Sequence, residues 1–243
     1  MLEIRHIGIK TTRDTRAAYD DIYSKTGILH RDALYEWLID LLQPNLGESL
    51  VDISCGQGRL VALALKRGLV AFGTDFSFGG VYRGHQVEPS AGWWVADGER
   101  ISLQSASVDY VTHIGSLEHY MHPLDGAKEI ARILKPNGKA CILLPNAFGL
   151  MGNIRHVYRT GDIFDDRQPL QRYATRRVWE NILVSAGLHV ERVIGYGEVV
   201  SPRSTRDILW YLKRPNKVAR LLISTITPLN LANHFVFICT SHP

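Results

Sequence analysis

The chain has 243 residues, of which 45% are apolar, a length and composition that favour one large α/β domain over two independent domains. Its three cysteines, Cys55, Cys141 and Cys239, are far apart and form no CxxC pair, so neither a disulfide framework nor a structural zinc site is expected, and a reducing cytoplasm fits best. Residues 1–10 alternate apolar and charged side chains, which predicts neither a signal peptide nor a membrane span.

The net charge of +4 is unevenly distributed, because residues 150–220 hold thirteen Lys/Arg against seven Asp/Glu. This excess permits three kinds of partner near the C-terminal third: an acidic substrate, a nucleic acid or an anionic membrane surface. A solvated helical face is the more common reason for such a pattern. The oligomeric state is not encoded in it.

The predicted elements follow one another as alternating strands and helices. Apolar residues at helical spacing predict two helices within 12–43, separated at Gly27. Strands are expected at 49–53, 69–74, 93–96, 108–113, 139–144, 188–194 and 234–240. Helices are expected between several of them, at 60–67, 122–134 and 175–186. This alternation predicts a Rossmann-like, doubly wound α/β sheet of about seven strands in a single domain.

Two ranges interrupt the alternation. Residues 145–174 are rich in Gly, Asn, Asp and Arg, and a stretch of this length is expected to form a lid between the core ranges 49–145 and 175–195. Residues 201–230 form a second insertion before the last strand. They mix aromatic, aliphatic and basic residues as interfacial helices do, although packing on the sheet or on another subunit explains the pattern equally well.

Polar residues and glycines follow the first strands of the predicted sheet. Gly56 and Gly58 follow the strand that contains Asp52, and they let the backbone approach a ligand closely. Asp75 ends the next strand, where a carboxylate can accept hydrogen bonds from both hydroxyls of a ribose, and Asp97 ends the third. A nicotinamide dinucleotide fits less well, because its fingerprint requires a further glycine where this chain has Val61.

These segments resemble the motifs of class I S-adenosylmethionine-dependent methyltransferases, particularly the ubiquinone/menaquinone-biosynthesis-like group, across roughly residues 17–195. The matching segments are 51–58, 73–77, 96–99, 108–111, 117–119 and 130–139. The resemblance implies S-adenosylmethionine as the cofactor, S-adenosylhomocysteine as its product, and a last strand that runs antiparallel. The resemblance implies a set of cofactor-binding residues, which includes Asp52 before the glycine-rich turn and Ser77 after Phe76. The full set is Asp52, Ser54, Gly56, Gly58, Asp75, Phe76, Ser77, Asp97, Gly98 and Ile114.

The sequence departs from the family pattern at Ser54, which replaces the first glycine of the glycine-rich turn. A serine fits there if its φ is negative and its hydroxyl finds a partner, so at worst weaker binding is expected. Some relatives place a metal with Glu, Glu and His after the fourth strand. Here Glu118 and His119 are present but Gly115 occupies the first acidic position, so no metal is expected.

The acceptor is the least defined part of the prediction. If it is a hydroxyl, a base helps to remove its proton, and His119 is the best-placed candidate, although it can equally bind backbone groups. Arg155 and His156 are the candidates for acceptor binding, while Arg159, Arg172 and Arg176 either clamp an anion or lie on a solvated helix surface. The segment 113–116 differs from the turn of nucleic-acid base methyltransferases, which disfavours a nucleic-acid substrate.

The expected function is therefore methyl transfer to oxygen, nitrogen or carbon of a small or lipid-linked metabolite, with peripheral membrane contact as a further possibility. A nicotinamide-dependent oxidoreductase and a non-catalytic adenosylmethionine-binding module are the alternatives. Ser54 and the lack of a clear base motivate the second of these.

Overall fold

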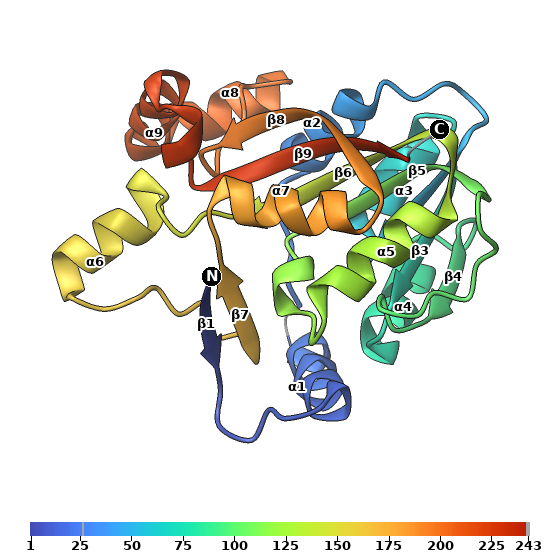
Figure 1. Cartoon of the computed structure of the whole chain (residues 1–243). Helices are drawn as coiled ribbons and strands as arrows, with labels where there is room; N and C mark the ends of the chain where they lie inside the picture. Colours follow the sequence, from blue (N-terminus) through green and yellow to red (C-terminus); the bar gives the residue numbers. More distant parts are fainter. Residues whose placement is uncertain (26, 242–243) are drawn as a thin grey trace.

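The computed structural model describes residues 1–25 and 27–241 and is built on one sheet with the strand order β4-β3-β2-β5-β6-β9-β8 (Figure 1). These strands are β2 Ser49–Ile53, β3 Val70–Asp75, β4 Gly92–Val95, β5 Val108–Ile114, β6 Leu134–Pro145, β8 Leu188–Tyr196 and β9 His234–Ser241. Strands β2 to β6 pair in parallel, and β9 lies antiparallel between β6 and β8. The predicted fold class is confirmed, including the antiparallel last strand.

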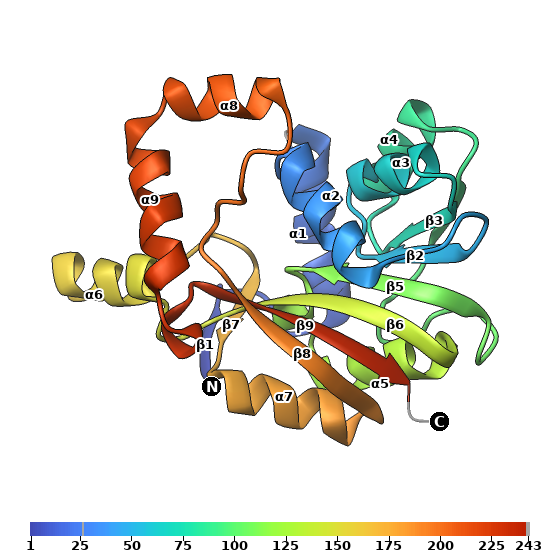
Figure 2. The ribbon, with the colours of Figure 1, turned by 90° about the horizontal axis from the view of Figure 1, so that it is seen from above.

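Helices cover both faces of the sheet (Figure 2). On one face lie α2 Asp32–Leu42, α3 Arg59–Lys66 and α4 Phe78–Val87; on the other lie α5 Pro123–Ile133 and α7 Arg176–Ser185. The helical spacing of apolar residues explains the packing, because Leu38 and Leu42 of α2 meet Leu60 of α3 in one core cluster. Ile130 of α5 and Trp179 of α7 belong to the cluster on the opposite face. The two clusters hold the sheet rigid beneath its carboxyl edge.

A second, two-stranded sheet joins the N-terminus to the range expected to form a lid. Strand β1 Leu2–Arg5 pairs antiparallel with β7 Leu170–Tyr173, and every residue of β7 is buried. Neither strand was predicted, because each has only four residues and its partner lies more than half the chain away. The helices η2 Leu150–Ile154 and α6 Arg155–Thr160 occupy the middle of the same range. The lid role of residues 145–174 stays a prediction.

Helix α1 Thr12–Lys25 packs against α4. The short helix η1 Leu117–His119 follows β5, and η3 Leu229–Leu231 precedes β9. Helices α8 Thr205–Leu212 and α9 Pro215–Ile226 project from the body at the end of the molecule that also carries α6 (Figures 1 and 2). In the described part of the chain, no helix has both the length and the apolar character needed to cross a bilayer.

Candidate functional site

A cavity of about 900 Å³ lies at the carboxyl edge of the sheet. Its floor is formed where β2, β3 and β5 end, at Ser54, Asp75 and Ile114. The predicted cofactor-binding residues that line it are Asp52, Ser54, Gly56, Asp75, Phe76, Asp97, Gly98 and Ile114, while Gly58 and Ser77 lie outside the lining. A volume of this size is near the upper end for ligand pockets and leaves room for two small ligands side by side.

Asp75 is held in one orientation by the backbone around it. Its Oδ2 accepts a hydrogen bond from the Gly56 N–H at 2.9 Å, and its Oδ1 accepts one from the Ser77 N–H at 2.8 Å. Each carboxylate oxygen keeps a second lone pair for a ligand donor. Burial raises the pKa of Asp75 to about 6, against the lowering effect of these hydrogen bonds. Ser77 therefore acts behind the cavity, where it fixes the carboxylate and caps α4.

Asp52 and the adenine-side residues lie beside this carboxylate. Asp52 is buried and accepts a hydrogen bond from the Thr112 hydroxyl at 2.7 Å, and burial raises its pKa to about 7. Phe76 follows Asp75, with its ring 5.5 Å from that of Tyr19. Asp97 accepts a hydrogen bond from the Glu99 N–H at 2.9 Å, which fixes the turn that contains Gly98.

Ser54 differs from its expected conformation. Its φ is +57°, in the left-handed region, so the expectation that a serine needs a negative φ here was wrong. The second expectation, a hydroxyl partner, is met by the Tyr120 Oη at 2.8 Å. Tyr120 also pairs with the His113 Nε2 at 3.0 Å, which connects the glycine-rich turn to β5. The hydrogen bond between Ser54 and Tyr120 helps to offset the strain of a serine at a position suited to glycine.

Two glycines of the prediction are required by neighbouring aromatic rings. A Cβ on Gly58 would lie 2.0 Å from Trp93, so this glycine makes room for packing behind the cavity. A Cβ on Gly98 would lie 1.8 Å from the Tyr120 Oη, so Gly98 admits the tyrosine that holds Ser54. Both glycines therefore shape the site indirectly, by leaving space for Trp93 and Tyr120, which are not among the predicted cofactor-binding residues.

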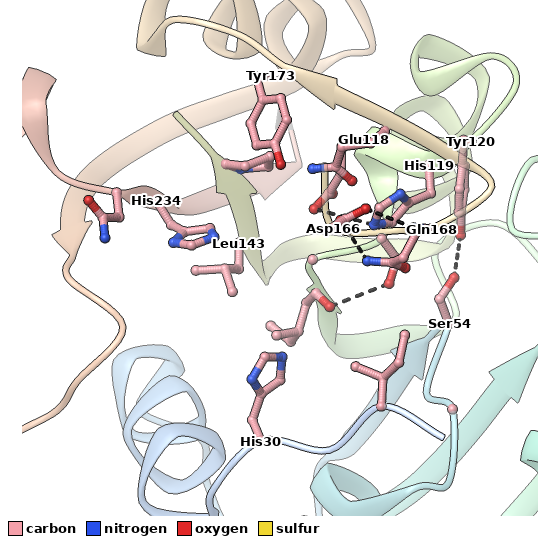
Figure 3. Close-up of a pocket in the computed structure, with 18 of the residues that line it drawn as sticks. His30, Ser54, Glu118, His119, Tyr120, Leu143, Asp166, Gln168, Tyr173 and His234 are labelled. Carbon is pink, nitrogen blue, oxygen red and sulfur yellow. Dashed lines mark hydrogen bonds and ion pairs between the residues drawn. The ribbon is translucent and has the colours of Figure 1, made fainter. Parts of the chain in front are cut away.

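His119 lines the cavity from η1 (Figure 3). Its Nδ1 lies 2.5 Å from the Leu170 carbonyl oxygen, and because a carbonyl only accepts, Nδ1 carries the proton. Nε2 therefore has the free lone pair. Burial lowers the pKa of His119, so the imidazole is neutral at neutral pH and can accept a proton.

Two unpaired polar atoms belong to residues that line the same cavity as His119. Its Nε2 is 3.9 Å from Glu118 Oε1, and burial raises the pKa of Glu118 to about 8, so this carboxyl is largely protonated at neutral pH. Within residues 1–25 and 27–241, Glu118 Oε2 and Gln171 Oε1 have no hydrogen-bond partner although both atoms are buried. Buried polar groups are rarely left unpaired, so these atoms mark a place where a polar ligand group can bind.

The arginines singled out in the sequence have different positions. Arg172 is buried in β7, where its guanidinium donates to the backbone carbonyls of Glu118 and Tyr120 and pairs with Glu3 at 2.8 Å. Neither an anion clamp nor a solvated surface describes it, because its donors hold the segment that carries His119. Arg176 pairs with Glu180 at 2.8 Å. Arg155, Arg159 and His156 do line the cavity, from α6.

Several lining residues were missed in the sequence. Tyr19 and Tyr23 are buried on α1 and line the cavity, and the Tyr19 hydroxyl donates to Gln168 Oε1 at 2.7 Å. Gln168 in turn donates to Asp166 Oδ2 at 2.8 Å. The pair of tyrosines four residues apart in an otherwise polar helix was the available signal. The contact of Gln168 with Tyr19 spans 149 residues and has no local signature.

Comparison with known proteins agrees with this geometry. Residues 51–142, from β2 to β6, match the family model described as a methyltransferase domain. A demethylmenaquinone methyltransferase of Corynebacterium kroppenstedtii is 31% identical over 102 residues, which cover 42% of this chain and 43% of that protein. Residues 51–142 are therefore similar in sequence to a methyltransferase domain, the part of the chain that carries the glycine-rich turn, Asp75 and Asp97. The matched stretch is thus less than half the length of this relative.

Solved structures share the fold of this chain. A chain of the complex between the Trm112 methyltransferase activator and a methyltransferase of Haloferax volcanii superimposes with a TM-score of 0.64 at 17% identity, covering 96% of this chain and 99% of that chain. An S-adenosylmethionine-dependent methyltransferase of Mesorhizobium loti gives a TM-score of 0.64 at 15% identity, covering 86% and 97%. Identities this low establish the fold alone.

In residues 1–25 and 27–241, the cavity has neither a reactive thiolate nor a metal cluster beside it. Cys55 lines it, but burial raises the pKa of this thiol well above its ordinary value, so it is not a thiolate at neutral pH. In the described ranges, no group of three or more His, Cys, Asp or Glu side chains is arranged to hold a metal ion. The polar groups that line the cavity include those around Asp75 and His119, together with His30 and His234.

Proposed function

We propose that this chain binds S-adenosylmethionine along the carboxyl edge of β2 to β5 and transfers its methyl group to oxygen, nitrogen or carbon of a small or lipid-linked metabolite. The observation that carries the proposal is the buried Asp75 carboxylate, oriented by two backbone N–H groups at the end of β3. Each of its oxygens keeps a lone pair for one ribose hydroxyl. The name of the relative, demethylmenaquinone methyltransferase, is in line with a lipid-linked acceptor.

In this proposal the chain supplies binding, alignment and a proton acceptor. S-adenosylmethionine, when bound, supplies an electrophilic methyl group. Asp75 would hold the ribose, Phe76 the adenine face, and Asp97 with Gly98 the adenine edge, while the backbone from Ser54 to Gly56 would lie along the methionine part. The walls exclude water and orient the acceptor, which is most of what an in-line displacement requires.

The acceptor would bind on the His119 side of the same cavity. There the Nε2 lone pair of His119 would accept the proton of an acceptor hydroxyl while its oxygen bonds to the methyl carbon and the carbon–sulfur bond breaks, which would leave S-adenosylhomocysteine. The unpaired oxygens of Glu118 and Gln171 bind further polar groups of the acceptor. Arg155 and His156 on α6 line the outer part of the cavity, where they would contact the rest of the acceptor.

The test is calorimetric titration with S-adenosylhomocysteine, with NAD and NADP titrated in parallel. Saturable binding of the adenosyl ligand alone is the expected result. Binding of a nicotinamide cofactor alone would favour an oxidoreductase, which Val61 already disfavours because it is a fully buried core residue of α3 where the dinucleotide motif requires a glycine. Binding without methyl transfer to any acceptor would favour a non-catalytic module.

Asp75→Asn tests the ribose contact. We expect the affinity for S-adenosylhomocysteine to fall by about 10- to 150-fold, since a hydrogen bond to a charged group is worth about 1.5–3 kcal/mol. Asp109→Asn is the matched control, because Asp109 is also a hydrogen-bonded strand carboxylate but pairs with Ser49 and Lys135 away from the cavity. Equal affinities of the Asp75 variant and the wild-type protein would contradict the assignment.

The raised pKa of Asp75 predicts a pH dependence of cofactor binding. Because the carboxyl has a pKa of about 6 and the ionised form accepts the ribose hydroxyls, the affinity should be constant well above pH 6 and should fall as the pH drops through 6. The decrease should approach roughly tenfold per pH unit. Titrations of the wild-type protein and Asp75→Asn across this range provide the measurement. A variant with the same slope would show that another group is responsible.

A further inference from the structure

Helix α9 presents an apolar face to solvent. None of its residues is buried, and Val218, Leu222 and Ile226 recur at four-residue intervals with exposed fractions of 36%, 64% and 80%. Residues at this spacing lie on one face of a helix. On the side toward the body, Arg220 donates to the carbonyls of Gly197 and Met151, and Ile223 and Ser224 are half-buried. Helix α9 thus exposes a row of apolar residues on the side where a helix of a globular protein usually has polar ones.

Helix α8 has the same orientation. Its inner side holds Asp207, which forms an ion pair with Arg31, and Tyr211, which donates to the Val200 carbonyl at 2.5 Å. Three large aliphatic residues of α8 are exposed instead, and they are Ile208, Leu209 and Leu212. The two helices contact each other and project from the sheet (Figure 2). Single exposed apolar residues are normal on a protein surface, but these two helices expose several large ones together.

The charge of this segment identifies the kind of surface that it fits. Residues 201–230 contain six Lys/Arg and one acidic residue, Asp207, which already pairs with Arg31. Lys213 and Arg214 are exposed where α8 meets α9, and Lys217 lies in the first turn of α9. A second copy of the chain docked on this face through a two-fold axis would bring two positively charged patches together. Anionic lipid headgroups instead provide the opposite charge next to an apolar layer.

We propose that α8 and α9 bind the surface of a bilayer that contains anionic lipids. The apolar face of α9 lies at the boundary between headgroups and acyl chains, and the cations between the two helices contact the lipid phosphates. Arg220, on the inner side of α9, also lines the large cavity, so the membrane-bound helix borders the proposed site. Membrane binding itself requires neither cofactor nor acceptor and stands apart from the proposed methyl transfer.

The test is co-flotation of the purified protein with vesicles. Vesicles of phosphatidylcholine with phosphatidylglycerol should bind the protein, pure phosphatidylcholine vesicles should bind it much more weakly, and added salt should weaken binding to the anionic vesicles. Leu222→Ser with Ile226→Ser should abolish most of the binding. Replacing Lys213 and Lys217 by Gln should reduce it by about fivefold for each charge removed.

Val184→Ser is the matched control, because Val184 is an exposed apolar residue of α7, which covers a face of the sheet away from α9. Thermal unfolding of each variant confirms that it is folded. No binding of the wild-type protein to anionic vesicles would overturn the proposal. So would an equal loss for Val184→Ser, or a dimer in solution that the α9 variant dissociates, since a second copy would then cover this face.

Discussion

Replacing His119 by Gln is expected to slow methyl transfer to a hydroxyl acceptor by about 10²- to 10⁴-fold, the range typical of a lost general base. The reason is the fixed tautomer, because the hydrogen bond from Nδ1 to the Leu170 carbonyl leaves the Nε2 lone pair for the acceptor proton. Glutamine has a similar length but no basic nitrogen. The measurement is the transfer of labelled methyl groups from S-adenosylmethionine to the acceptor that the wild-type protein modifies.

The same variant should bind S-adenosylhomocysteine with nearly wild-type affinity, because His119 lies on the acceptor side of the proposed site. His85→Ala is the control, since His85 is an exposed histidine of α4 outside the cavity lining. A loss of cofactor affinity in His119→Gln would place this residue in the cofactor pocket instead. Unchanged turnover would mean that alignment alone accounts for the reaction, or that the acceptor carries no proton that must be removed.

The sequence predicted the part of the site that lies on the sheet. Asp75 and Asp97 could be placed because parallel strands end at a common edge, so carboxylates at strand ends meet there whatever the rest of the chain does. The order of strands and helices followed from the alternation of short apolar runs with amphipathic segments. These features depend on residues close together in the chain, and the fold preserves them.

The other wall of the site depends on contacts between distant segments. His119 is oriented by Leu170, 51 residues away, and Arg172 holds the same segment while it pairs with Glu3, 169 residues away. The pairing of β1 with β7 makes both contacts possible, and a four-residue strand has too little pattern to be recognised. The partner of the Ser54 hydroxyl could not be named for a related reason, because Tyr120 comes from the turn after β5, 66 residues away.

Gly58 shows how a motif residue can act through packing, and Gly58→Ala is expected to lower the free energy of unfolding by about 2–5 kcal/mol. About 1–2 kcal/mol comes from the left-handed φ of +69°, and about 1–3 kcal/mol from overpacking against Trp93. Urea denaturation of the two proteins provides the measurement.

The Trp93 ring cannot easily move away from a Cβ at Gly58. Gly73 and Gly84 also face it, and Cβ atoms there would lie 2.5 and 2.6 Å from the ring, while its Nε1 donates to the Glu88 carbonyl at 2.9 Å. Gly47→Ala is the matched control, with a φ of +79° and open space around the added methyl, so it should lose only the backbone contribution. Equal losses in the two variants would mean that the Trp93 ring moves to accommodate the added methyl group. A Gly58 variant of unchanged stability but weaker S-adenosylhomocysteine binding would mean that Gly58 contacts the cofactor directly.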